Sequence, residues 1–404
     1  MSQFDTKVPL KTDNPSVVFC EELCIDCGAC RHSCETDASA TSTAQPVCVH
    51  CGQCTIVCPS AAITEKYDYA SVKTAISDSN KIVIFNIAPA VKVSLGEEFN
   101  MPGLCEGKIV AALRALGANY VLDVCFSADL VVLEEAAEFT ERLKSGGTLP
   151  LFTSCCSSWV QYVEAFFPKM LPNVSTAKSP IATQGGAVKT YFAKQHNIDP
   201  AKIVNVAVAP CTAKKHEINQ TNGTDFVITA RELAKWIKED GINLDGLQTA
   251  NYDSLMGTAS GAGVIFGNTG GVTEAVARTI CYQTTGQTPG ADYLNFQAVR
   301  GMNGIKTATV DVAGKAINVA VVHGLDNAKE VLEDIAAGKC AYDFIEVMAC
   351  RGGCIGGGGQ PRTAVPTDDT LRKSRIEMLY KKDSDAPLRA SYQNPDVKAM
   401  EAGV

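Results

Sequence analysis

The sequence lacks several features that would place it in common classes of protein. Its 36 Lys and Arg residues are outnumbered by 44 Asp and Glu residues, and none of the basic residues form a stripe that could neutralise phosphates. No apolar run reaches the roughly 18 residues that a membrane-spanning helix needs. We therefore expect no nucleic-acid partner and no membrane segment. With 404 residues, 46% of them hydrophobic, the chain can still build a large core and two or three domains.

The first residues also lack the basic end and apolar stretch of a secretory signal, so we expect a cytoplasmic protein. Disulfides are rare in that compartment. The sequence nevertheless has 18 cysteines, and nine of them fall between Cys20 and Cys58. In a reducing environment such cysteines should be metal ligands or catalytic thiols.

The cysteine-rich segment contains a repeat. Residues 24–34 read CIDCGACRHSC and residues 48–58 read CVHCGQCTIVC, both with the spacing C-x2-C-x2-C-x3-C. This is the bacterial ferredoxin pattern, in which the fourth cysteine of each run binds the cluster of the other run. The pattern predicts two 4Fe-4S clusters, one held by Cys24, Cys27, Cys30 and Cys58, the other by Cys34, Cys48, Cys51 and Cys54. A zinc ribbon and a disulfide knot are the alternatives, but zinc needs one set of four ligands, not two interleaved sets.

The rest of the chain alternates two kinds of segment. Apolar β-branched runs at 81–91, 119–124, 149–155, 202–211, 225–229, 317–324 and 342–350 are typical of buried strands. Helical patterns lie at 107–116, 130–144, 159–169, 184–195, 230–239, 273–280 and 327–337. Alternation of this kind predicts an α/β architecture with mostly parallel sheets, which we expect to form a two-lobed domain divided between residues 177 and 200.

Three of these strands run directly into cysteines. They lead to Cys155 and Cys156, to Cys211, and to Cys350 with Cys354 close behind. Because ligands bind at the carboxyl ends of parallel strands, five cysteines in these places indicate one site between two lobes. The alternative is a set of unrelated buried thiols.

The residues around these cysteines resemble three signature segments of the iron-only, or FeFe, hydrogenases: TSCCSSW (153–159), APCTAKKHE (209–217) and EVMACRGGCIGGGGQP (346–361). The resemblance extends over nearly the whole chain and includes 126–139, 264–278 and 389–395. The active site of that family is the H-cluster, a 4Fe-4S cube joined through a cysteine sulfur to a two-iron unit that carries CO, cyanide and a bridging dithiolate.

The resemblance implies a role for individual residues. The cube would be held by Cys156, Cys211, Cys350 and Cys354, with Cys354 as the bridge to the two irons. Cys155 would be the free thiol that exchanges protons with the dithiolate, and Lys214, oriented by Glu217, would donate to a cyanide. Four further residues would line the pocket, namely Met348, Phe266, Ala88 and Pro89.

The family's proton path matches Cys155, Glu135, Ser175 and Glu138. In a helix over 130–144, Glu135 and Glu138 would share one face, with Val131, Val132 and Phe139 near Glu135. We therefore expect partial desolvation to raise the pKa of Glu135 toward a value useful for proton transfer. The alternative is a solvated acidic face.

The signature segments depart from the usual family pattern in three places. Ser157 and Ser158 replace Pro-Gly and can cap the following helix, and Ala209 replaces Met and would leave space near the cluster. Arg351 replaces Pro between two cube ligands, where an unneutralised cation would raise the reduction potential of the cube.

Together these observations predict a bacterial-ferredoxin-like α+β domain over residues 1–78, an H-cluster domain over 79–365, and a segment over 366–404 that wraps the second domain. The expected activity is reversible oxidation of H2 and reduction of protons. Ferredoxin or flavodoxin would supply electrons, and dedicated maturation proteins would supply the two-iron unit. A slow H2 sensor and an iron–sulfur assembly relative without the two-iron unit are the alternatives.

Overall fold

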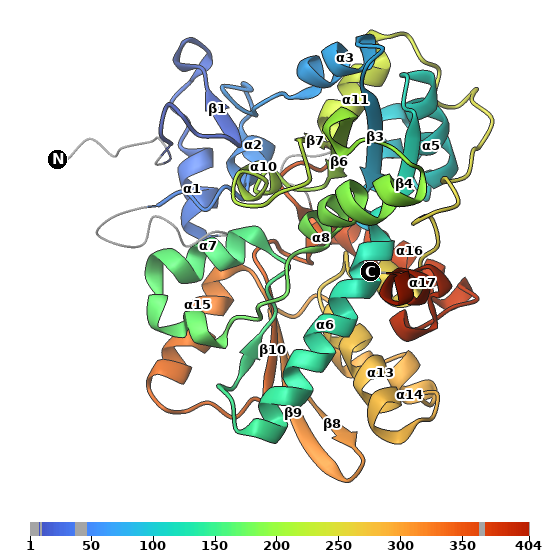
Figure 1. The fold of residues 1–404 in the computed structure, drawn as a ribbon. Helices are drawn as coiled ribbons and strands as arrows, with labels where there is room; N and C mark the ends of the chain where they lie inside the picture. The colour runs from blue at the N-terminus through green and yellow to red at the C-terminus, as the bar shows by residue number, and fades with distance from the viewer. Residues whose placement is uncertain (1–7, 9, 37–46, 363–367, 404) are drawn as a thin grey trace, which may run out of the picture.

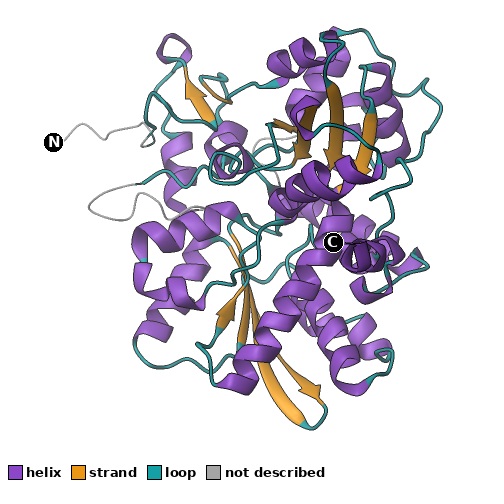
Figure 2. Cartoon of the chain, viewed as in Figure 1, coloured by secondary structure: helices purple, strands orange, loops and turns teal. Residues whose placement is uncertain are grey.

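A computed structural model describes residues 8, 10–36, 47–362 and 368–403 (Figures 1 and 2). It contains a small N-terminal unit beside two larger lobes, each built around a four-stranded sheet. The expected α/β class, with mostly parallel sheets and a small α+β N-terminal domain, is confirmed. Among these described residues, no helix has both the length and the apolar character needed to cross a bilayer.

The N-terminal unit folds as the repeat predicts. Strands β1 (Val17–Phe19) and β2 (Ile63–Glu65) pair antiparallel, and between them lie helices α1 (Ala29–Thr36) and α2 (Gln53–Val57). Each helix follows a glycine with a positive φ, 72° at Gly28 and 74° at Gly52. This left-handed turn is accessible to glycine at little cost, and it curls both cysteine loops in the same way.

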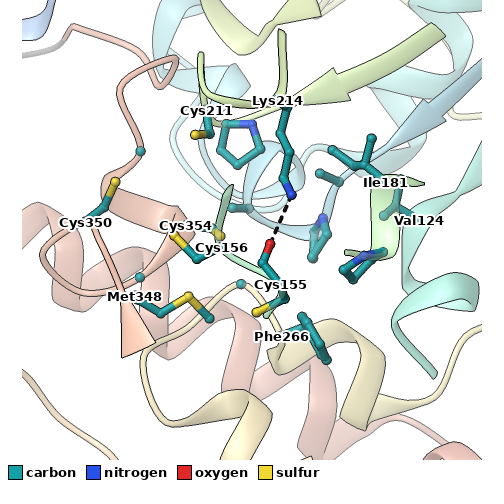
Figure 3. Close-up of a pocket in the computed structure, with 18 of the residues that line it drawn as sticks. Val124, Cys155, Cys156, Ile181, Cys211, Lys214, Phe266, Met348, Cys350 and Cys354 are labelled. Carbon is teal, nitrogen blue, oxygen red and sulfur yellow. Dashed lines mark hydrogen bonds between the residues drawn. The ribbon is translucent and has the colours of Figure 1, made fainter. Parts of the chain in front are cut away.

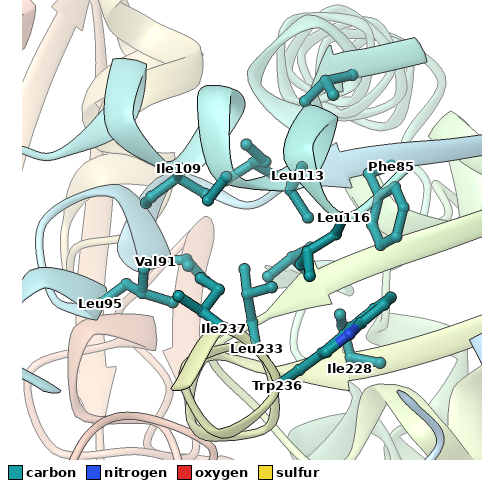
Figure 4. Close-up of a cluster of buried hydrophobic side chains, with 14 of the residues drawn as sticks. Phe85, Val91, Leu95, Ile109, Leu113, Leu116, Ile228, Leu233, Trp236 and Ile237 are labelled. Carbon is teal, nitrogen blue, oxygen red and sulfur yellow. The ribbon is translucent and has the colours of Figure 1, made fainter. Parts of the chain in front are cut away.

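The first sheet is parallel and has the order β4-β3-β6-β7, with β3 at Ile82–Ile87, β4 at Tyr120–Asp123, β6 at Ile203–Ala209 and β7 at Phe226–Thr229. Helices cover both faces, which explains the continuous apolar sequences of its strands. Val83, Phe85 and Ile87 face a core that includes Trp236 of α11 (Ala230–Glu239) and Leu113 of α5 (Glu106–Ala115) (Figure 4). Ile84 and Asn86, which alternate with them, face α6 (Val124–Ser145) and α8 (Pro180–Ala187).

The second sheet has the order β5-β10-β9-β8, with β5 at Leu151–Phe152, β8 at Ile305–Val312, β9 at Lys315–His323 and β10 at Phe344–Met348. Strand β10 is parallel to both neighbours, whereas β8 and β9 form an antiparallel hairpin. Its turn places Ala313 and Gly314 at positive φ, as a tight hairpin turn requires. The sequence analysis missed β8 because this edge strand alternates polar with apolar residues instead of forming a continuous apolar run.

The expected division of the lobes between residues 177 and 200 is wrong. Strand β5 precedes that boundary in the chain, yet it pairs with β10 in the second sheet, while β3, β4, β6 and β7 share the first. The chain therefore passes repeatedly between the lobes. Helix α6 (Val124–Ser145) makes this possible because it packs on the first sheet through Phe126 and on the second through Val131.

The remaining helices surround these sheets. They are α3 (Tyr69–Ser77), α4 (Pro89–Lys92), α5 (Glu106–Ala115), α7 (Ser157–Phe166), α8 (Pro180–Ala187), α9 (Ala193–Gln195), α10 (Lys214–Glu217), α11 (Ala230–Glu239), α12 (Gly261–Ile265), α13 (Gly271–Thr285), α14 (Ala291–Leu294), α15 (Leu325–Ala336), α16 (Asp369–Asp385) and α17 (Pro395–Gly403). A π-helical turn, η4 (Val188–Phe192), joins α8 to α9. Short 3-10 turns occupy Glu21–Leu23, Leu95–Phe99, Pro168–Asn173, Pro200–Lys202, Gln297–Val299, Cys354–Gly356 and Ser391–Gln393.

Two of these helices bear on the expected domain limits. Helix α3 lies before residue 78, but its Val72 is fully buried in the core of the first sheet. In space α3 therefore belongs with that lobe, and the boundary expected after residue 78 falls one helix too late. At the other end of the chain, α16 packs against α12 and α17 packs against α6.

Candidate metal centres

A buried cavity lies where strands of both sheets end (Figure 3). Ala88 and Pro89 follow β3, Val124 follows β4, and Cys211 follows β6. From the second sheet, Cys155 and Cys156 follow β5, and Cys350 and Cys354 follow β10. The five cysteines predicted to form one site therefore line one cavity, at the carboxyl ends of parallel strands.

The loop after β10 is shaped by backbone that only glycine can form easily. Gly353 has φ 93°, and a Cβ atom there would lie 2.6 Å from the backbone nitrogen of Thr269. The loop thus presses against the segment that carries Phe266, and both face the cavity. The glycines at 356–359 have a related role. Gly358 lies against the backbone of Cys51 and Gly52 in the N-terminal unit, whereas Gly357 lies against the backbone oxygens of Pro210 and Cys354.

The four cysteines expected to hold the cube suit an iron–sulfur cluster. Burial, reinforced by the charges of neighbouring cysteines, raises the pKa of Cys211 to about 11 and that of Cys354 to about 12, and raises the pKa of Cys350 well above its usual value. Such thiols become thiolates only when a strongly positive group compensates them. A cube meets this condition, because its irons are positively charged and each takes one cysteine.

One cation reaches the cavity. Lys214 in α10 donates to the backbone oxygen of Cys155 at 3.0 Å (Figure 3). It also donates to both carboxylate oxygens of Glu217, at 2.9 and 3.0 Å. Burial alone would lower the pKa of Lys214, but the Glu217 carboxylate outweighs it and the pKa is raised. The ammonium therefore stays charged beside the sulfurs.

The other lining residues are mostly apolar. Met348 and Phe266 line the cavity as expected, together with Ala88 and Pro89. The sequence analysis missed further lining residues, namely Ala90, Val124, Ala128, Ser157, Pro180, Ile181, Pro210, Gly267, Ala349, Gly353 and Gly357. Nothing in the local pattern of these small or apolar residues separates them from ordinary core positions.

Two residues that were expected to contact the cofactor are not among those that line the cavity. Ala209 is fully buried within β6 and packs behind the cavity wall, in one cluster with Val124 and Ile181, which do line it. Arg351 points outward: its side chain is 51% exposed and its guanidinium pairs with Asp369 at 2.7 and 2.8 Å. The turn between Cys350 and Gly353 directs residue 351 to the surface, and a buried guanidinium would have lost its hydration.

Glu135 in α6 is fully buried beside the cavity wall. The backbone N–H of Ser154 donates to its Oε1 at 3.2 Å, while its Oε2 has no hydrogen-bond partner. Burial raises the pKa of Glu135 to about 8, in line with the sequence analysis. Burial, followed by the nearby charge of Glu135, also raises the pKa of the Cys155 thiol. Burial therefore favours the protonated, uncharged form of both side chains.

Glu138 lies one turn further along α6 and is closer to solvent. Its Oε2 accepts from the Ser175 hydroxyl at 2.7 Å, and its Oε1 accepts from Arg142 at 2.5 Å. Burial would raise the pKa of Glu138, but these donors and those of Thr176 outweigh it and the pKa is lowered. Among the described residues no direct hydrogen bond joins Glu135 to Cys155 or to Ser175.

The N-terminal cysteines form two further groups. One cavity is lined by Cys24, Cys27, Cys30 and Cys58, and a second by Cys34, Cys48, Cys51 and Cys54. Each group takes three cysteines from one run and the fourth from the other, as the ferredoxin pattern predicts. This crossing disfavours a simple zinc ribbon.

A contact that the sequence did not indicate joins the second N-terminal group to the central cavity. The side-chain amide of Gln53 donates to the Cys350 sulfur at 3.4 Å and to the backbone oxygen of Gly356 at 2.9 Å. Thr212 also donates to the backbone oxygen of His50 at 2.7 Å. The central cavity and the second group are therefore in direct contact, through the first residue of α2 and through the loop that precedes it.

Comparison with protein families agrees with this arrangement. Residues 81–358 match the family described as "Iron only hydrogenase large subunit, C-terminal domain". Residues 21–37 and 45–68 match the "4Fe-4S binding domain". The first match alone covers more than half of the chain.

Curated relatives include two hydrogenase subunits and one assembly component. The NADP-reducing hydrogenase subunit HndD of Solidesulfovibrio fructosivorans is 44% identical over 84% of this chain, but the match spans only 60% of HndD. The periplasmic [Fe] hydrogenase large subunit of Nitratidesulfovibrio vulgaris is 45% identical, with 72% of this chain and 71% of that protein covered. The cytosolic iron-sulfur assembly component 3 of Bos taurus is 31% identical, with coverage of 76% and 68%.

Among solved structures, the E141A variant of [FeFe]-hydrogenase HydA1 from Chlamydomonas reinhardtii superposes with a TM-score of 0.72. It is 34% identical, and the match covers 83% of this chain and 93% of HydA1. The chain is therefore a member of the iron-only hydrogenase family, with 4Fe-4S clusters and an H-cluster as its cofactors.

Proposed function

We propose that this protein interconverts H2 with two protons and two electrons. The observation that supports this most is the meeting of Cys155 and Lys214 with four other cysteines in one buried cavity. A cube alone needs only four thiolates. The fifth thiol and the ammonium have a use when a second, anionic unit lies beside the cube, as in the H-cluster.

Within that proposal, Cys156, Cys211, Cys350 and Cys354 would hold the cube, and Cys354 would also be the link to the two-iron unit. The H-cluster supplies the redox metal at which hydrogen is formed or split. Lys214, held by Glu217, offers an ammonium donor to the cyanide end of that unit. Met348 and Phe266 exclude water from the same space.

Protons reach the cavity through side chains of α6 and its neighbours. Glu138 exchanges protons with solvent, and its hydrogen bond to Ser175 carries them inward. The next acceptor is the unpartnered Oε2 of Glu135, and the last is the Cys155 thiol. The raised pKa of Glu135, about 8, allows it both to hold and to release a proton near neutrality.

Electrons enter through the N-terminal clusters. The first cysteine group includes Cys27, which is exposed. In the second group, Gln53, which lies between Cys51 and Cys54, donates to Cys350 of the central cavity. We therefore place a soluble carrier, ferredoxin or flavodoxin, at the first cluster and the exit of electrons at the second. Dedicated maturation proteins supply the two-iron unit, because nothing in the described cavity could synthesise CO or cyanide.

The proposal locates the protein in the cytoplasm, where 18 cysteines can remain reduced until clusters are loaded. Fractionation of the source cells with antibodies against the chain tests this location. Recovery with periplasmic markers would contradict it.

An infrared spectrum of the protein matured with its accessory proteins tests the central proposal. CO and cyanide stretching bands, together with H2 evolution from a reduced dye, are expected. A protein with a full complement of 4Fe-4S clusters and neither band would refute it. That result would instead favour a role in iron–sulfur assembly, the second candidate, which the 31% identical assembly component supports.

A further inference from the structure

The serine that replaces the usual proline of the first signature segment does not act as a helix cap. Ser157 is the first residue of α7, and the preceding N-cap residue, Cys156, makes no capping hydrogen bond. The Ser157 hydroxyl instead donates to Oε1 of Glu217 at 2.7 Å. Ser157 also lines the central cavity and is 6% exposed.

Glu217 thereby becomes the centre of a small network. Its Oε2 accepts from the Ser179 hydroxyl at 2.7 Å, and both of its oxygens accept from Lys214. Ser157, Lys214 and Glu217 come from α7 and α10, which follow strands of different sheets. The network therefore ties the two walls of the cavity together at the ammonium.

We propose that Ser157 is a positioning residue that holds Glu217 so that the Lys214 ammonium stays directed at the two-iron half of the H-cluster. This inference rests on the proposed function. Hydroxyl donation satisfies a lone pair of Oε1 that would otherwise compete for the ammonium. A proline at 157 has no donor, so the usual family residue would leave Glu217 with Ser179 and Lys214 alone.

The adjacent Ser158 is a matched control. It lies in the same turn of α7, is 1% exposed, and its hydroxyl has no hydrogen-bond partner among the described residues. Ser158→Ala removes a buried hydroxyl of the same kind without touching Glu217. Proline is also well tolerated at the first position of a helix, so Ser157→Pro removes the hydroxyl donor with little cost to the stability of α7.

The experiment uses full-length protein carrying its 4Fe-4S clusters, loaded with a synthetic two-iron complex that bears two cyanides, CO and a dithiolate. Infrared bands and the fraction of complex retained after gel filtration are measured for wild type, Ser157→Ala, Ser157→Pro, Ser157→Thr and Ser158→Ala. Visible absorption of the cubes confirms that each variant has folded.

We expect Ser157→Ala and Ser157→Pro to move one cyanide band and to weaken retention of the complex by roughly tenfold, the usual effect of losing a hydrogen bond to a charged group. Ser157→Thr should keep the wild-type band, and Ser158→Ala should match wild type. Wild-type bands and retention in both Ser157→Ala and Ser157→Pro would overturn the role of Ser157 alone. Loaded wild-type protein without CO and cyanide bands would overturn the proposed function and this inference together.

Discussion

The N-terminal cysteine groups and the central cavity are two different solutions to holding iron–sulfur clusters. The N-terminal groups take all eight cysteines from residues 24–58, three on two short helices and five on the adjoining loops, and leave Cys27 exposed. The central cavity gathers five cysteines from three distant segments at the ends of two sheets. The first arrangement is set by local spacing, whereas the second exists only when the whole α/β domain is folded. Exposure suits exchange of electrons with a carrier, and burial suits chemistry that must exclude water.

The largest effect on activity is expected from removing Cys155, the one thiol of the central five that is not proposed to hold the cube. Cys155→Ala should keep its iron and its CO and cyanide bands, yet lose hydrogen evolution by about 10²- to 10⁴-fold, the range for removing a positioned proton-transfer group. Cys105→Ala is the control, since Cys105 is buried in the core of the first sheet. Full activity of Cys155→Ala would show that protons reach the cavity another way.

Glu135 offers the next test, because it belongs to the central cavity and has no part in the N-terminal groups. Glu135→Gln keeps the shape of the side chain but cannot exchange a proton, so we expect hydrogen evolution to fall about 100-fold. Glu134→Gln is the control, since Glu134 is the adjacent residue and is exposed. Unchanged turnover in Glu135→Gln would remove this residue from the proton path.

The same substitution has a consequence for stability. The pKa of Glu135 is about 8 in the folded chain and 4.5 ordinarily, so between these values the native state binds more protons than the unfolded state. Wild-type stability should therefore fall as the pH rises through this window, relative to Glu135→Gln, by up to about 1.4 kcal/mol per pH unit. Urea unfolding of both proteins from pH 5 to 8 measures the difference. Parallel curves would contradict the burial of an ionisable carboxyl here.

The two regions also differ in how far the sequence predicted them. Spacing alone predicted the N-terminal groups, including the crossing of Cys34 and Cys58, because each run folds locally. It also placed the central cysteines at strand ends, since buried parallel strands have a clear apolar pattern. It failed for the division into lobes, because strand pairing such as β5 with β10 depends on contacts nearly 200 residues apart in the chain.

Side-chain direction was the other failure. The departures at Ser157 and Arg351 were visible in the sequence, but only the fold shows that one hydroxyl faces Glu217 and that the guanidinium faces solvent. Gln53 gave no signal at all, since a glutamine in a short helix is usually solvated. Its contact with Cys350 arises from the packing of two units.

A smaller effect is expected of salt on the rate at which a carrier reduces the N-terminal clusters. The exposed loop at 21–27 carries Glu21, Glu22 and Asp26, and residues 17–30 contain no Lys or Arg. An acidic ferredoxin should therefore react faster as salt screens the repulsion, up to about 0.1 M, where the Debye length is about 10 Å. Stopped-flow reduction of the N-terminal clusters measures this. The double variant Glu22→Gln, Asp26→Asn should flatten the dependence, and a rate that is independent of salt in wild type would argue that the carrier docks elsewhere.

The smallest effect is expected at Arg351, although its position between two cube ligands suggested a large one. Charge influences a cluster according to distance and screening, and this guanidinium is 51% exposed and paired with Asp369. Hydrogen bonds from Arg351 and, less strongly, from Arg372 lower the pKa of Asp369 to about 2, so this carboxylate stays ionised beside both guanidinium groups above that pH. Arg351→Pro should leave the cube potential, measured by redox titration with electron paramagnetic resonance, close to that of wild type. Asp369→Asn, which leaves Arg351 without this carboxylate, should raise the potential slightly and more so at low salt. A large downward shift in Arg351→Pro would mean that this cation acts on the cube despite its pairing with Asp369. The central cavity would then be less well shielded from surface charge than its burial indicates.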